Sequence, residues 1–197
     1  MGPLVRVAVI GAGAAVLSAV AIGGGLWLSG NDPDVPESGD VHTAATGCDA
    51  VTDELLAERM PGAVADTREQ GPLAGGDSLV CVWTSAGASE GGDRGTLRVD
   101  VSALFTDATG EEPVTGAERA AGAYTDLLPA RAQPVDLSRG EGRVWHGQAP
   151  GTAELAFHSD NLLVRVSYAG LAGDDPVDPD DAAELAAEFA GLIGASL

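Results

Sequence analysis

Residues 153–168 read AELAFHSDNLLVRVSY, two runs of alternating apolar and polar side chains that flank Asp160-Asn161. Alternation with a period of two predicts a pair of half-buried β-strands. A two-residue turn at Asp160-Asn161 brings the apolar side chains of both strands to one face, whereas a three-residue turn would place Leu155 opposite Arg165. The stretch therefore predicts a tight hairpin. Its cross-strand pairs would be Phe157 with Val164, Leu155 with Val166 and Ala153 with Tyr168.

Similar patterns continue on both sides of the hairpin. Alternation predicts further strands at Leu79–Trp83, Leu97–Ala103 and Arg143–His146. Apolar residues at helical spacing predict three helices, which cover about Ala50–Met60, the segment opened by a capping box at Thr115, and the residues after Pro179. We therefore expect an α+β fold, an antiparallel sheet with three helices packed on one of its faces.

The composition excludes several classes of protein. The chain has 197 residues, of which 45% are hydrophobic, and 30 acidic residues against 10 basic ones give a net charge of −20. The apolar fraction excludes a disordered acidic chain, and the lack of a basic footprint excludes a nucleic-acid binder. Two cysteines are too few for a disulfide-dense scaffold. What remains is an acidic globular protein with one domain, expected at residues 48–197.

The first thirty residues differ from the rest of the chain. Val7–Gly30 contains no charged residue, and as a helix it would span about 36 Å, enough to cross a bilayer. Arg6 precedes this segment and acidic residues follow it, which favours a cytoplasmic N-terminus and an extracytoplasmic domain. We expect residues 1–30 to be a single-pass transmembrane anchor that contacts the membrane through residues 7–30. A signal peptide cleaved after Ala19-Val20-Ala21 is the open alternative.

Residues 31–47 contain proline, glycine and acids without an apolar period, and they predict a flexible acidic linker between membrane and domain. The charge divides at this point. Residues 1–31 carry one arginine and no acid, a charge of +1, while the remainder carries nine arginines and 30 acids, a charge of −21. The acidity belongs to the exported part, where it favours a cationic or protein partner over an anionic membrane surface.

Cys48 and Cys81 are the only cysteines in the chain. An even number of cysteines on the outer side of a membrane predicts a disulfide bond. In the chain-entropy account, a loop of about 34 residues makes such a bond worth roughly 3.5–4 kcal/mol. The bond would join the first helix to a strand.

Trp145, His146 and Tyr168 form the first candidate site. All three lie on predicted strands, and they could line an apolar pocket. Large aromatic residues more often fill a core, so packing is the competing interpretation.

Asp174, Asp175 and Asp178 form the second candidate site, within the densest acidic cluster of the chain. Carboxylate oxygens bind hard cations, so these residues are a candidate for weak calcium binding. Their position before the last predicted helix favours capping of that helix instead. We expect no resident metal ion and no other cofactor.

The spacing Gly-x-Ser-x-Gly occurs at residues 87–91, but in a glycine-rich loop between two predicted strands that favours a hairpin connection over a nucleophile, and no His-Glu-x-x-His motif is present. These patterns are typical of a serine nucleophile on a strand-to-helix turn and of a zinc-dependent protease. We therefore expect no catalytic residues.

Four further marks point to a family. They are Cys48-Asp-Ala-Val at the start of a helix, Cys81-Val-Trp83-Thr-Ser in a strand, Gly140-Glu-Gly-Arg-Val-Trp145 before the hairpin, and an alanine-rich last helix. With them, residues 48–197 resemble a family of uncharacterised actinobacterial cell-envelope lipoproteins, and more loosely the extracytoplasmic sensor domains of receptor kinases from such bacteria. The resemblance implies an exported, disulfide-bonded protein. Asn31 stands where the family carries its lipid-bearing cysteine, so the resemblance implies no lipid anchor here.

Tether, spacer and compact domain together predict a non-catalytic binding or sensing module of the bacterial cell envelope. Its partner would be an unidentified protein or small ligand there. Two alternatives stay open, an envelope hydrolase with a dispersed active site and a structural partner of a membrane complex. The second alternative would act through the Gly/Ala-rich membrane helix.

Overall fold

The computed structural model describes residues 32–86, 93–137 and 141–197, and Pro33–Leu197 forms one compact unit. Within these residues the chain forms a 3₁₀ turn, three α-helices and eight strands. The helical elements are η1 (Cys48–Ala50), α2 (Asp53–Arg59), α3 (Gly116–Leu127) and α4 (Pro179–Ser196). The strands are β1 (Ala63–Leu73), β2 (Gly76–Ser85), β3 (Arg94–Leu104), β4 (Gln133–Asp136), β5 (Glu141–His146), β6 (Thr152–Ser159), β7 (Leu162–Ala172) and β8 (Asp175–Pro176).

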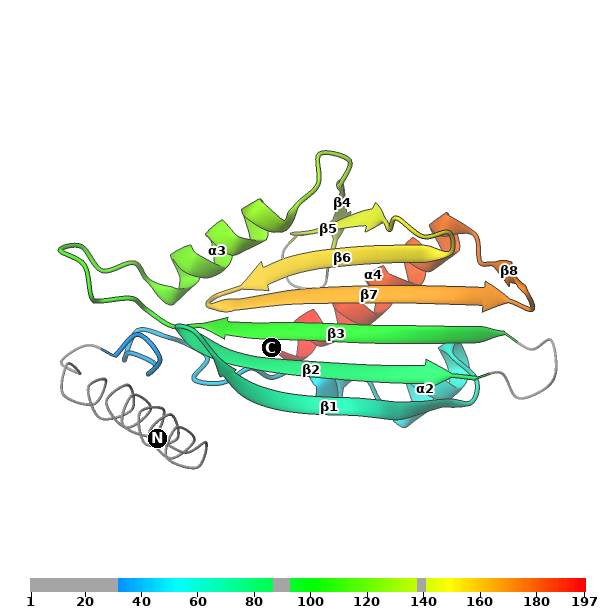
Figure 1. Cartoon of the computed structure of the whole chain (residues 1–197), viewed down its shortest axis with the longest axis horizontal. Helices are drawn as coiled ribbons and strands as arrows, with labels where there is room; N and C mark the ends of the chain where they lie inside the picture. Colours follow the sequence, from blue (N-terminus) through cyan, green and yellow to red (C-terminus); the bar gives the residue numbers. More distant parts are fainter. Residues whose placement is uncertain (1–31, 87–92, 138–140) are drawn as a thin grey trace, which may run out of the picture. The chain divides into compact units, whose positions relative to one another are not determined.

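The strands form a single antiparallel sheet in the order β1-β2-β3-β7-β6-β5-β4, and β8 pairs with the end of β7 (Figure 1). The α+β class with an antiparallel sheet and three helices is therefore confirmed. The pairing of β3 with β7 brings together two strands that lie far apart in the sequence, and it makes them the centre of the sheet.

The β6–β7 hairpin has the predicted register. Phe157 pairs with Val164, and the two other expected pairs are also present. The turn consists of Asp160 and Asn161, and Asp160 adopts a left-handed backbone conformation with φ 49°. This conformation is tolerated by aspartate, and it lets the chain reverse within two residues.

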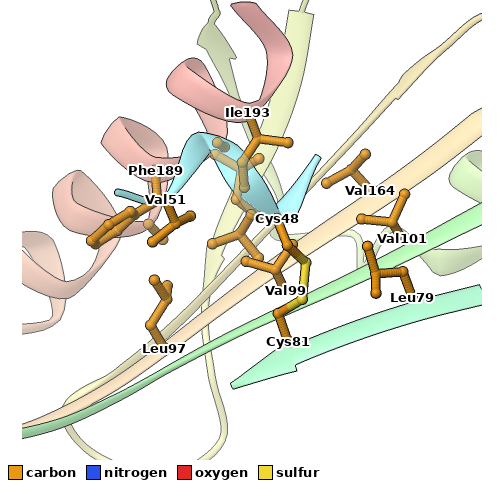
Figure 2. Packing of buried hydrophobic residues seen from close by; sticks show 14 of the residues in the cluster. Cys48, Val51, Leu79, Cys81, Leu97, Val99, Val101, Val164, Phe189 and Ile193 are labelled. Atoms are coloured by element: carbon orange, nitrogen blue, oxygen red, sulfur yellow. A yellow bond between two sulfur atoms is a disulfide. The ribbon is translucent and has the colours of Figure 1, made fainter. Parts of the chain in front are cut away.

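One face of the sheet carries the hydrophobic core. Alternate residues of β3, namely Leu97, Val99, Val101 and Ala103, are almost completely buried, as expected from their alternation. Phe189 and Ile193 of α4 pack on them and on the matching residues of β7 (Figure 2). Helix α4 passes behind β6 and β7 in Figure 1, and α2 lies behind the sheet as well. We call this side the core face.

Helix α3 is on the other face, which corrects the expectation that all three helices share one face. Its Leu127 lies beside Leu163 and Arg165, whose side chains alternate with the buried residues of β7. The ring of Tyr124 lies 5.1 Å from that of His158, which points to the same side. The capping box at Thr115 and Glu118 is present as predicted. Only Gly116 and Ala120 of α3 are buried, so the helix covers part of this face.

The first predicted helix, Ala50–Met60, is interrupted. The 3₁₀ turn η1 ends at Ala50, and α2 begins at Asp53 after the N-cap Thr52, whose hydroxyl accepts a hydrogen bond from Leu55 N. Strand β1 was not predicted from the sequence either. This strand forms the edge of the sheet and exposes side chains on both faces, so it has no alternation of apolar residues.

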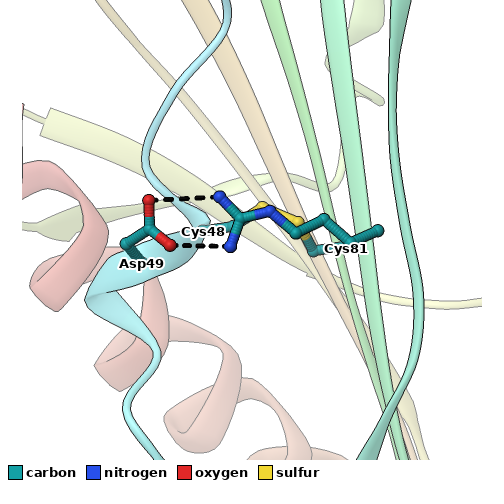
Figure 3. The surroundings of a disulfide bond; sticks show 4 residues. Cys48, Asp49 and Cys81 are labelled. Carbon is teal, nitrogen blue, oxygen red and sulfur yellow. Dashed lines mark hydrogen bonds and ion pairs between the residues drawn. A yellow bond between two sulfur atoms is a disulfide. The ribbon is translucent and has the colours of Figure 1, made fainter.

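The disulfide bond between Cys48 and Cys81 is present, as predicted (Figure 3). It joins η1 to β2, and both cysteines are buried in the core. Beside it, the guanidinium of Arg68 donates to both carboxylate oxygens of Asp49 at 2.6 and 3.1 Å. These hydrogen bonds and the positive charge of Arg68 lower the pKa of Asp49. The segment around η1 is thus attached to β1 and to β2.

Residues 33–47 differ from the flexible linker predicted for 31–47, because they pack along the domain. Asp40 accepts hydrogen bonds from the backbone N and the hydroxyl of Thr106 at 3.0 and 2.8 Å. Asp34 accepts from Gly75 N, and Ala45 N donates to Asp77. The acids that suggested a solvated spacer serve instead as acceptors for backbone N–H groups of the domain.

The predicted membrane segment at 1–30 lies outside the described residues. Among residues 32–86, 93–137 and 141–197, no helix is long and apolar enough to span a bilayer.

Candidate functional site

The face opposite the core carries alternating charged and hydroxyl side chains on the two central strands. On β3 these are Arg98, Asp100 and Ser102, and on β7 they are Arg165 and Ser167, which follow the apolar Leu163 on the same side. The register places Asp100 opposite Arg165 and Arg98 opposite Ser167. We call this side of the sheet the open face. An antiparallel sheet with one face on the core commonly has such a polar second face.

Two ion pairs organise the open face. Arg98 binds Asp100, with Nε 2.8 Å from Oδ2 and Nη2 2.6 Å from Oδ1. Arg165 donates through Nε and Nη2 to Oε2 of Glu154 on β6, at 3.0 Å for Nε. The hydrogen bond to Asp100 raises the pKa of Arg98 above its ordinary value. Both arginines are roughly half exposed, at 49% and 41%, so each pair contributes at most about 1 kcal/mol to stability.

Each arginine retains donors that the protein does not use. Nη1 of Arg98 and Nη1 of Arg165 donate no hydrogen bond to any part of the chain that the structure describes. A guanidinium has five N–H donors in a fixed plane, and carboxylates fit the edge of that plane. The ion pairs therefore hold the two guanidinium groups in place while leaving one edge of each for an acceptor.

Helix α3 forms a wall beside these residues. Tyr124 contacts His158 of β6, and burial raises the pKa of Tyr124. One turn further along the helix, Leu127 reaches over the sheet. The result is a hollow of about 480 Å³, which we call the sheet hollow. It is lined by Arg98, Asp100, Ser102, Leu127, Leu163, Arg165 and Ser167.

The structure divides the first predicted site between the two faces. His146 opposes Ala153 on the core face, with its Nε2 3.3 Å from a carboxylate oxygen of Asp180, whereas Trp145 opposes Glu154 on the open face. These two residues help to line a hollow of about 190 Å³ that does not include Tyr168.

Tyr168 lies on the far side of Ala153 from His146. A methyl group on Gly170 would lie 2.6 Å from the Tyr168 hydroxyl, so the Tyr168 side chain runs along the core face over that residue. Burial raises the pKa of its hydroxyl. Tyr168 is therefore adjacent to the packed side of the sheet and not to the Trp145 hollow.

The predicted acidic site is divided among three separate roles. Asp174 binds Arg94 at 2.9 Å, Asp175 belongs to β8, and Asp178 caps α4 by accepting a hydrogen bond from Asp180 N at 2.9 Å. Capping, the interpretation that the sequence favoured, is confirmed for Asp178. Among the residues that the structure describes, no three His, Cys, Asp or Glu side chains are grouped as metal ligands.

Comparison of the chain with protein-family models, with curated proteins and with solved structures found no match. The resemblance to cell-envelope lipoproteins therefore stays a prediction.

The sheet hollow was not predicted from the sequence. The alternation that predicts a strand at Leu97–Ala103 leaves Arg98, Asp100 and Ser102 on the side away from its apolar residues, but it does not show which segments lie next to them. The signal that could have found the site is the similar alternation of β7, in which Leu163, Arg165 and Ser167 separate buried residues. Sequence alone does not place β7 next to β3, because Leu104 at the end of β3 and Asn161 just before β7 are 57 positions apart.

Proposed function

We propose that this chain is a membrane-tethered, extracytoplasmic binding or sensing module of the bacterial cell envelope, that it acts without catalysis, and that it binds its ligand in the sheet hollow. The main support for this proposal is the hollow itself, which combines fixed guanidinium groups, hydroxyls and two leucines at one place. A concave site of this size with a few convergent polar groups is the common form of a small-molecule site.

Two observations support an exported protein. The Cys48–Cys81 disulfide is buried, and disulfides persist mainly in oxidising compartments outside the cytoplasm. The uncharged stretch Val7–Gly30 precedes the domain, with a single arginine before it. In such a protein the domain would present its open face to the envelope, while residues 1–30 hold it at the membrane.

The full-length chain in detergent micelles tests the binding role. Ligand-observed NMR with a collection of small polar metabolites is expected to identify compounds that bind the wild-type chain. The variant Ser167→Phe fills the hollow from its floor and should abolish that binding. The matched control is Glu69→Phe, which adds the same ring to an exposed position of β1 on the same face of the sheet, away from the hollow.

Binding that survives in Ser167→Phe would contradict the proposed site, and a collection without any binder would contradict the proposed function. N-terminal sequencing of the mature protein separately tests the tether. An intact N-terminus supports the anchor, whereas a new terminus after Ala21 supports the signal peptide.

A further inference from the structure

We propose that the sheet hollow binds a small zwitterion with one carboxylate, one ammonium group and a short apolar side chain, the chemistry of a free apolar α-amino acid. This inference rests on the proposed binding function and names its ligand class. Four features of the hollow support it, and each concerns a different part of such a ligand.

The carboxylate would bind between Arg98 and Arg165. Because Arg98 opposes Ser167 and Arg165 opposes Asp100, the two arginines are diagonal neighbours on adjacent strands. Such positions are about 7–8 Å apart, a separation that long side chains can bridge. The unused Nη1 group of each arginine can then donate to one ligand carboxylate. Hydrogen bonds between guanidinium and carboxylate are about twice as strong as neutral ones.

The ammonium group would bind the acids beside these arginines. Asp100 lines the hollow and remains 29% exposed. Glu154 of β6 lies outside this lining, beside Arg165, from which it accepts both hydrogen bonds at Oε2, while its Oε1 accepts none within the described part of the chain. An ammonium group has three donors and no acceptor, so a half-used carboxylate is a suitable partner. The hollow thus offers opposite charges side by side.

The apolar side chain would contact Leu127 of α3 and Leu163 of β7, which both line the hollow. The hydroxyls of Ser102 and Ser167 complete the lining and can bind either polar group of the ligand. A volume of about 480 Å³ falls at the lower end of the range for small-ligand pockets, about 300–1,000 Å³.

The charge of the chain favours a ligand without net charge. Residues 32–197 carry a charge of −21, and this field repels a simple anion as it approaches. The two lining arginines against one lining aspartate would attract an anion only at short range. A zwitterion experiences no net long-range repulsion, and it satisfies both signs of charge once it is bound.

Isothermal titration calorimetry with the full-length chain in detergent micelles tests the proposal. The probes are L-leucine and two analogues that each lack one of its charged groups, 3-methylbutylamine without the carboxylate and 4-methylpentanoate without the ammonium. We expect L-leucine to bind, and each analogue to bind at least about tenfold more weakly, which corresponds to about 1.4 kcal/mol per lost contact.

Variants of the protein separate the hollow from other charged sites. Arg165→Gln and Arg98→Gln should each weaken L-leucine binding about tenfold or more. Arg68→Gln is the matched control, because it breaks an exposed Arg–Asp pair outside the hollow and should leave binding unchanged. Arg98 is the second test position in case Arg165→Gln disturbs folding by leaving Glu154 unpaired, and circular dichroism of each variant checks the fold.

The inference is wrong if L-leucine does not bind, if either analogue binds as tightly as L-leucine, or if the hollow variants bind it as the wild type does. The proposed function has a separate test. If L-leucine does not bind but metabolites of another class bind the wild type and not Ser167→Phe, the proposed amino-acid ligand is wrong and the proposed binding function stands. If neither L-leucine nor any compound of the metabolite collection binds, both proposals are wrong.

Discussion

The side-chain amide of Asn161 exchanges two hydrogen bonds of 2.8 Å with the backbone of His42, 119 residues earlier in the chain. Its Nδ2 donates to the His42 carbonyl, and its Oδ1 accepts from His42 N. The same Nδ2 donates to the carbonyl of Leu104 at 3.0 Å. Asn161 is only 1% exposed. This residue of the β6–β7 turn therefore joins the 33–47 segment to the end of β3.

Replacement of Asn161 by alanine should lower the free energy of unfolding by about 2–4 kcal/mol, since one buried and two part-buried hydrogen bonds are lost at about 1 kcal/mol or more each. Urea denaturation followed by circular dichroism measures the change. The control Asp160→Asn keeps the turn and its left-handed residue, so it should alter stability by less than about 0.5 kcal/mol. Equal midpoints for Asn161→Ala and the wild type would refute the structural role.

Reduction of the Cys48–Cys81 bond should lower the free energy of unfolding by about 3.5–4 kcal/mol, because the denatured chain regains the freedom of the closed loop. Urea midpoints with and without dithiothreitol give the value. In the control Asp49→Asn the disulfide stays intact and only an exposed ion pair is weakened, so a loss below about 1 kcal/mol is expected. Identical midpoints for the oxidised and the reduced protein would contradict this prediction.

Two Gly→Ala substitutions should change the stability of the domain in opposite directions. Gly151 has φ +70°, and a Cβ there would lie 2.5 Å from the carbonyl oxygen of Gly170. Gly151→Ala should therefore destabilise the domain by about 1–3 kcal/mol. Gly122 is inside α3 with open space around it, so Gly122→Ala should stabilise by about 0.5–1 kcal/mol. Thermal unfolding of both variants tests the pair, and a shift in the same direction for both would be inconsistent with these environments.

Hydrogen bonds from the backbone N and the hydroxyl of Thr115 lower the pKa of Glu118 below its ordinary value of 4.5. Because the pKa is lower in the folded state, this contribution to stability is complete above pH 4.5 and is lost as the pH falls through the folded-state pKa. Thr115→Ala should raise the pKa of Glu118 toward 4.5, because it removes the hydroxyl. NMR titration of the Glu118 carboxyl measures it.

The control for this titration is Thr125→Ala on the same helix. The Thr125 hydroxyl donates to the carbonyl of Ala121 and not to a carboxylate, so this variant should leave the Glu118 pKa unchanged. A Glu118 pKa that stays the same in Thr115→Ala would show that the hydroxyl does not contribute.

Features that depend on neighbours in sequence were predicted well. The β6–β7 register follows from alternation on two adjoining strands, and the Thr115 capping box follows from two residues three positions apart. The Cys48–Cys81 bond required no geometry, because the chain has only two cysteines. In each case the pattern contains all the partners involved, so local chemistry is sufficient.

The placement of α3 and the sheet hollow could not be predicted in this way. An apolar stripe shows that a helix packs on something, but not on which face of a sheet it packs. The stripe of α3 is used only in part, since Ala120 is buried while Leu127 lines the hollow. The hollow itself requires the pairing of β3 with β7, because this pairing alone brings Arg98 and Arg165 together.

Sequence alone thus determined the composition, the two-residue turn at Asp160-Asn161, the helix caps and the covalent bond, because these depend on residue type and short-range spacing. Tertiary structure decided the paths of β1 and of residues 33–47. Neither segment has an apolar period, and each is held by partners from distant parts of the chain, such as Thr106 for Asp40 and β2 for β1. Backbone N–H groups that must be satisfied on folding select these partners, and that requirement is met only once the chain has assembled.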